Sequence, residues 1–240
     1  GDLDISILDE LPPGRQKVDT YAITSNKRKR AFNFIKKQID EGRQCYIICP
    51  MIDESGNDMA SVKDYSDKVK NSLLPGYNTA ILHGKMKSKE KEEVMRDFLD
   101  NKISVLISTT VVEVGVDVPN ATVMLIENAE RYGLSQLHQL RGRVGRGKYK
   151  STCILISDAQ NSEAVTRLKA MCLTNDGFKI SEQDLKLRGP GDFFGQRQHG
   201  LPELKIADMI NDIDIIKQSQ SAAQKIISAD TALTKQEHRG

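Results

Sequence analysis

The chain alternates between short segments that are apolar throughout and longer segments in which apolar residues recur every three or four positions. A short apolar run predicts a β-strand buried on both faces, and the longer period predicts an amphipathic helix. The expected strands cover residues 17–23, 45–51, 78–82, 103–108, 121–127 and 152–157. The expected helices cover residues 26–41, 61–74, 88–100 and 135–141. This alternation favours an α/β fold, with a parallel sheet flanked by helices on both sides.

Two of these helices carry more detailed predictions. The helix over 26–41 is expected to turn one apolar face toward the sheet, made of Ala31, Phe34, Ile35 and Ile39. Ser88 is expected to cap the helix over 88–100, because a serine oxygen can accept a hydrogen bond from a free N–H group at a helix start.

The pattern changes after about residue 158. Two helices, at 163–173 and 180–188, predict a hairpin, and a loop rich in glycine and proline follows at 188–203, before two short helices. We therefore predict three parts, which are a linker at 1–16, a sheet domain at 17–158, and a helical hairpin with a loop and C-terminal helices at 159–240.

The charge of the chain is clustered, although its net value is only +2. Residues 27–37 and 139–150 are rich in lysine and arginine and contain no acidic residue. Such clusters fit a polyanionic partner, and the alternative for the first cluster is a solvated helix face.

The cysteines and the apolar runs bear on the compartment. Four cysteines lack the spacing of a zinc site, so we expect free buried thiols in a reducing compartment. They are Cys45, Cys49, Cys153 and Cys172. No apolar run has the length of a membrane span, and no signal peptide is recognisable. We therefore expect a cytoplasmic protein with no metal site of its own.

The most specific run is QLHQLRGRVGRG, at 136–147. It spaces Gln139, Arg143 and Arg146 by four and three residues, so a helix or helical turn would project all three side chains from one face. Two guanidiniums and an amide aimed at one point suit the terminal phosphate of a nucleoside triphosphate. The alternative is a basic surface that holds nucleic acid loosely.

A second candidate site follows the expected strand at 103–108. Thr109 and Thr110 offer hydroxyls and backbone amides for a phosphate oxygen. Glu113 and Asp117 are two carboxylates on either side of Gly115, suited to a ribose, a magnesium-bound water or a facing arginine. The alternative is a capped loop whose acids satisfy backbone amides.

Polar loops follow three of the expected strands. They cover residues 83–86, residues 109–119 and the segment after Ile126. Because ligands bind at the carboxyl ends of parallel strands, we expect these loops to open on one edge of the sheet.

The order of these motifs resembles the second RecA-like domain of superfamily-two helicases. TTVVEVGVDVP resembles their motif V, QLRGRVGRG resembles motif VI, and the segment with His83 and Gly84 resembles motif IVa. The resemblance implies that Arg143 and Arg146 reach the γ-phosphate of ATP across a domain cleft. It also implies that Gly115 and Asp117 lie near the nucleotide. Motif V implies that Thr109, and with it Thr110, meets a nucleic-acid backbone phosphate, and His83 and Gly84 are further candidates for contact with DNA.

The segment FKISEQDLKLRGPGDFFGQRQHGLPE, at 178–203, resembles the TRG region of the RecG family of branched-DNA translocases. That family remodels stalled forks and Holliday junctions with the energy of ATP. The resemblance implies that Arg188 and Gln198 couple domain motion to DNA movement. The alternatives are a translocase of the transcription-repair coupling factor type and, for the loop alone, a disordered linker.

Two motifs of a complete motor are absent from the chain. There is no G-x-x-x-x-G-K-[ST] phosphate loop and no D-E-x-H box. We therefore expect a preceding motor domain to hold most of the ATP and Mg²⁺, together with an N-terminal wedge domain in a monomeric protein. The chain alone is expected to be inactive as an ATP hydrolase. The competing hypothesis is a non-catalytic module that keeps the fold and binds nucleic acid or a protein.

Overall fold

The computed structural model describes residues 16–49, 58–109 and 117–184, and a few helical positions between 218 and 228. Its centre is one six-stranded parallel sheet, with the strand order β1-β6-β5-β2-β4-β3. The strands are β1 (Val18–Ile23), β2 (Gln44–Ile48), β3 (Thr79–Leu82), β4 (Val105–Ser108), β5 (Ala121–Ile126) and β6 (Ser151–Ile156). The predicted α/β class with a RecA-like parallel sheet is confirmed, and each strand overlaps its predicted range.

Helices cover both faces of this sheet. They are η1 (Ser25–Lys27), α1 (Arg28–Asp40), α2 (Asp58–Lys68), the π-helical turn η2 (Val69–Leu73), α3 (Ser88–Leu99), η3 (Ala129–Arg131), α4 (Leu134–Arg141) and α5 (Ser162–Leu173). Residues 177–184 are also helical. No helix within the described residues has the length and apolarity needed to cross a membrane.

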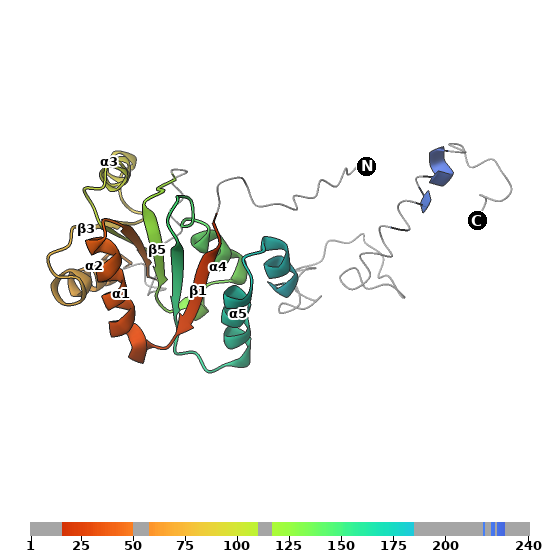
Figure 1. Cartoon of the computed structure of the whole chain (residues 1–240), viewed down its shortest axis with the longest axis horizontal. Helices are drawn as coiled ribbons and strands as arrows, with labels where there is room; N and C mark the ends of the chain where they lie inside the picture. The colour runs from red at the N-terminus through yellow and green to blue at the C-terminus, as the bar shows by residue number, and fades with distance from the viewer. Residues whose placement is uncertain are drawn as a thin grey trace. The chain divides into compact units, whose positions relative to one another are not determined.

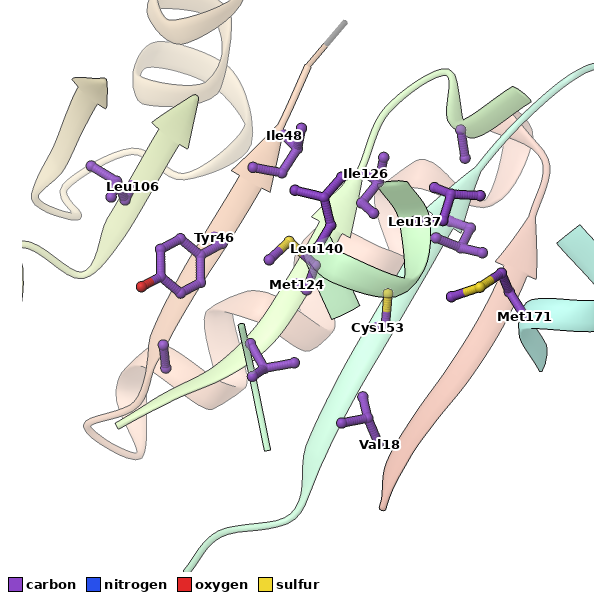
Figure 2. Close-up of a cluster of buried hydrophobic side chains, with 14 of the residues drawn as sticks. Val18, Tyr46, Ile48, Leu106, Met124, Ile126, Leu137, Leu140, Cys153 and Met171 are labelled. Atoms are coloured by element: carbon purple, nitrogen blue, oxygen red, sulfur yellow. The ribbon is translucent and has the colours of Figure 1, made fainter. Parts of the chain in front are cut away.

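The two faces bury separate apolar clusters. Figure 1 shows α1 and α2 on one side of the sheet and α4 and α5 on the other. In Figure 2, Leu137 and Leu140 of α4 lie over Met124 of β5 and Cys153 of β6. All four side chains are buried. The central strands read as continuous apolar runs because helices cover them on both sides.

The apolar face of α1 differs from the prediction at one position. Phe32 is buried (2 % exposed), whereas Phe34 is 36 % exposed. The helical period explains the difference. Phe32 shares a helix face with Arg28 and Ile35, whereas Phe34 lies at the margin of the buried face. Phe34 instead lines a hollow of about 620 Å³ between α1 and the two strands β1 and β6 at one edge of the sheet.

Two helix starts also differ from the prediction. Ser88 is the first residue of α3 and does not cap it. The N–H of Lys87 donates to Oε2 of Glu90 (3.0 Å), so a carboxylate in the first turn satisfies the start of this helix. The helix predicted at 180–188 begins at 177 and is described as far as 184.

Helix α5 packs on the same face of the sheet as α4. Leu168 and Met171 of α5 belong to the same buried cluster as Leu137 and Leu140, as does Ile180 of the following helix, and Figure 2 shows Met171. The domain boundary near residue 158 stays a prediction. The predicted loop at 188–203 lies outside the described residues.

The cysteines differ in exposure, which gives a first testable prediction. Cys45, Cys49 and Cys153 are buried and free, as expected, but Cys172 is exposed, so the expectation of four buried thiols is wrong there. Burial raises the pKa of Cys49 and of Cys153 to about 12. Partial burial also raises the pKa of Cys172, so we expect a thiol reagent such as DTNB to modify Cys172 ahead of the three buried thiols in the folded chain, and all four thiols in denaturant. A second rapidly reacting thiol in the folded chain would contradict this account.

Candidate functional site

The candidate residues lie at two opposite ends of the strands. Thr109 directly follows β4 and His83 directly follows β3, so both stand at the carboxyl end of the sheet. Asp117 lies shortly before β5 and Arg146 shortly before β6, at the amino end. The prediction that the whole loop from Thr109 to Pro119 opens on one edge is therefore wrong. A connection between two parallel strands must carry the chain back from the carboxyl end of one to the amino end of the next.

Helix α4 ends before the two candidate arginines. Its last residue is Arg141, and Gly142 follows as the C-cap. The expectation that one helical face presents both arginines with Gln139 is wrong, because Gly145 takes a φ of +79° that ends helical geometry. Gln139 is exposed on α4.

Residues 142–147, here called the arginine loop, are anchored at several points. Val144 is 3 % exposed and belongs to the core. The N–H of Gly145 donates to Oγ of Ser151 (3.1 Å), and its carbonyl accepts from the N–H of Gln16 (3.0 Å). A Cβ at Gly147 would overlap the carbonyl oxygen of Pro119. The loop is therefore held against the starts of β1, β5 and β6.

The two arginines of this loop have different partners. Arg146 forms an ion pair with Asp117, and its Nε donates to the carbonyl of Gly142 (2.8 Å). Arg143 is half-buried, and no carboxylate in the described part of the chain pairs with it. Burial raises the pKa of Tyr46 to about 12, and the positive charges of both arginines oppose that rise. Within the described residues, Asp117 therefore pairs with Arg146 and not with Arg143.

The carboxyl end holds the residues predicted to contact nucleic acid. Thr109 is 4 % exposed, whereas His83 is half-buried and Gly84 is exposed. The ammonium of Lys91 donates to the carbonyl of Gly84 (2.9 Å) and fixes this turn. Three other candidates, Thr110, Glu113 and Gly115, lie outside the described residues, as do Arg188 and Gln198.

Comparison with known families decides the identity of this fold. The model of the helicase conserved C-terminal domain matches residues 26–148. The chain belongs to the helicase C-terminal domain family. A second model, for domain 3 of the ATP-dependent DNA helicase RecG, C-terminal, matches residues 174–239. The resemblance to the RecG family is thereby confirmed, and the coupling-factor alternative is not favoured.

Individual relatives agree with this assignment. The chain is 47 % identical over 231 residues to the ATP-dependent DNA helicase RecG of Bacillus subtilis, and the alignment covers 96 % of this chain and 34 % of that protein. It is 42 % identical over 227 residues to the RecG helicase of Thermotoga maritima, covering 94 % of this chain and 29 % of that protein. The chain thus spans about a third of the length of these curated relatives.

Solved structures show the same likeness. A structure of RecG bound to a three-way DNA junction aligns with a TM-score of 0.67 at 39 % identity, over 87 % of this chain and 27 % of that chain. The second domain of the Mss116p DEAD-box helicase, at 18 % identity and a TM-score of 0.50, shares the fold.

A buried cluster in this helicase domain was not predicted from the sequence. Glu127, 3 % exposed, follows β5 and accepts two hydrogen bonds from Arg28, Nε to Oε1 at 3.0 Å and Nη2 to Oε2 at 2.8 Å. The hydroxyl of Tyr65 donates to Oε1 of the same carboxylate (2.9 Å). Burial and the charge of Glu127 raise the pKa of Tyr65. The cluster fixes α1 and α2 to the carboxyl end of β5, and the one available signal was an acidic residue directly after a buried strand.

Glu127→Gln should reduce the free energy of unfolding by about 2 kcal/mol, because it removes charge from the hydrogen bonds to Arg28 and Tyr65. Urea unfolding measures the effect, and a double-mutant cycle with Arg28→Met isolates the pair. The matched control is Glu41→Gln, which removes an exposed carboxylate paired with Lys37 and should change the free energy by less than about 0.5 kcal/mol. Equal effects of the two changes would contradict this account of the cluster.

Proposed function

We propose that this chain is the C-terminal motor part of an ATP-dependent double-stranded DNA translocase. The observation that carries the proposal is the half-buried guanidinium of Arg143, held in an anchored loop with no carboxylate partner in the described ranges. A planar, permanently charged group in an anchored loop suits a transferring phosphoryl group. The relatives named ATP-dependent DNA helicase RecG support this interpretation.

In this proposal the two ends of the sheet contact different ligands. The arginine loop serves the nucleotide, and the carboxyl end serves duplex DNA through Thr109, Thr110, His83 and Gly84. The separation of Arg146 from Thr109 by the length of the strands supports the division, because one domain can then contact ATP and DNA at once. Branched DNA, such as stalled forks and Holliday junctions, is the proposed substrate, and the similar RecG structure bound to a three-way DNA junction supports this choice.

ATP and Mg²⁺ are the proposed ligands of the complete motor. Arg143 would contact the γ-phosphate, Asp117 would orient Arg146, and Glu113 and Gly115 would lie near the ribose. No group of three potential metal ligands gathers within the described residues. Because the sequence contains no phosphate loop and no D-E-x-H box, we expect the preceding motor domain to hold most of the Mg²⁺ ligands, and this chain to contribute charge and orientation.

Arg188 and Gln198 are the proposed coupling residues, on the strength of the RecG family match over 174–239. The proposed protein acts as a monomer in the cytoplasm, with the first motor domain and the wedge domain as partners within one polypeptide.

The purified 240-residue chain should hydrolyse ATP no faster than the uncatalysed background, with or without duplex DNA, because it lacks a phosphate loop. A coupled assay for released phosphate tests this, with the full-length protein as positive control. Vigorous DNA-stimulated hydrolysis by the chain alone would refute the proposal.

A further inference from the structure

Arg141, the last residue of α4, is a buried cation with no carboxylate partner among the residues that the structure describes. Arg141 is 2 % exposed. Its Nη1 donates to the carbonyls of Met171 (2.7 Å) and Thr174 (2.8 Å) and lies 3.4 Å from Oγ1 of Thr20. Its Nη2 lies 3.3 Å from Nδ1 of His138. None of these partners is a carboxylate.

Burying such a group is unfavourable. Desolvation lowers the pKa of Arg141, yet an arginine side chain stays charged in a protein. A long apolar residue could fill the same space at lower cost, since a buried charge needs compensating partners. The retention of a guanidinium at this position therefore needs an explanation beyond packing.

The partners of Arg141 supply that explanation. Met171 lies in the last turn of α5, and Thr174 is its C-cap. Helix carbonyls at this end are unpaired and carry partial negative charge, so they compensate a cation without a carboxylate. Arg141 thus fastens the end of α4 to the end of α5.

The arginine loop begins at this fastening point. The N–H of Arg143 donates to the carbonyl of Leu140 (3.0 Å), and the N–H of Val144 donates to the carbonyl of Arg141 (3.2 Å). These hydrogen-bonded turns leave the backbone between Arg141 and Arg143 little conformational freedom. A displacement of Arg141 would therefore displace the guanidinium two residues later.

We propose that Arg141 is a positioning residue for the arginine loop, which sets the place of Arg143 relative to the γ-phosphate of ATP. The inference rests on the proposed function, in which Arg143 contacts that phosphate. Arg141 lies beneath the loop and does not touch the nucleotide.

The test compares Arg141→Met and Arg141→Lys with wild type in the full-length protein. Methionine keeps the length and removes the charge, whereas lysine keeps the charge and can reach one carbonyl. Leu168→Ala is the matched control, because it weakens the packing of α5 and removes none of the hydrogen-bond partners of Arg141. The readouts are the melting temperature, the DNA-stimulated kcat and KM for ATP, and the affinities for ADP and for ADP with beryllium fluoride, a γ-phosphate mimic.

Arg141→Met should lower kcat by about 10²-fold, the scale of a misplacement of roughly 1 Å, while KM changes little. Affinity for the beryllium fluoride complex should fall, and affinity for ADP should persist. Arg141→Lys should recover part of kcat. Leu168→Ala should lower the melting temperature and leave kcat near wild type.

A wild-type kcat in Arg141→Met, or equal losses of kcat in Arg141→Met and Leu168→Ala, would overturn the positioning role. If Arg141→Met does not fold, Arg141→Gln, which also removes the charge, takes its place, and a wild-type kcat in that variant has the same consequence. Arg143→Ala separates the two claims. If it loses hydrolysis while both Arg141 variants keep it, only the positioning role fails, whereas normal hydrolysis in Arg143→Ala removes the proposed function itself.

Discussion

Arg143→Ala in the full-length protein should lower DNA-stimulated ATP hydrolysis by about 10³–10⁵-fold, the usual range for loss of an arginine that stabilises phosphoryl transfer. We expect this large loss of hydrolysis rate because Arg143 is half-buried in the anchored arginine loop, and no carboxylate among the described residues pairs with it. Initial rates at saturating duplex DNA measure the loss, and the affinity for ADP should stay close to wild type.

The control for this change is Arg30→Ala. Arg30 is an exposed cation on α1, on the opposite side of the sheet from the arginine loop. Its removal should leave the hydrolysis rate close to wild type. Hydrolysis that survives in Arg143→Ala, or that falls equally in Arg30→Ala, would exclude a specific contact between Arg143 and the γ-phosphate.

Gly145→Ala should reduce the free energy of unfolding by about 2–4 kcal/mol, through a left-handed backbone and overpacking together. The φ of Gly145 is +79°, and a Cβ there would lie 2.8 Å from Cγ2 of Val18 and 3.0 Å from the carbonyl oxygen of Gln16. Urea unfolding of the chain followed by circular dichroism measures the change. Because relief of the overlap would move the arginine loop, hydrolysis by the full-length protein should fall as well.

Gly76→Ala separates the two causes. Its φ of +85° is similar, but no atom lies within 4 Å of the added methyl group. We expect a loss of about 1 kcal/mol, from the backbone conformation alone. Equal losses at Gly76 and Gly145 would show that the close approach of β1 to the arginine loop contributes nothing to stability.

The layered fold could be predicted because each signal is local. The strand β5 is buried at all six positions and carries six consecutive apolar or small residues, and α5 shows a helical period within its own sequence. Phe34 could not be placed in the same way, because an apolar residue at the margin of a helical face can point to the core or to an open hollow, and the position of β1 decides which.

The motif residues of the site were predictable, but their arrangement was not. Arg143 and Arg146 look equivalent in the sequence, and only the structure shows that Asp117 pairs with one of them. Glu127 and Arg28 are 99 residues apart, and Arg141 meets the carbonyl of Met171 across 30 residues. Such contacts depend on how the helices dock on the sheet. Neither hydrophobic periodicity nor a local motif predicts a contact between residues so far apart in the sequence.

The proposed role of this chain is to turn ATP hydrolysis into DNA movement, and Arg188 belongs to the segment matched by the RecG family model. The decisive experiment follows ATP hydrolysis and unwinding together, on one three-way junction DNA, with full-length wild type and Arg188→Ala. We expect Arg188→Ala to continue to hydrolyse ATP but to lose unwinding. Unchanged unwinding at an unchanged rate of hydrolysis would contradict the proposed coupling.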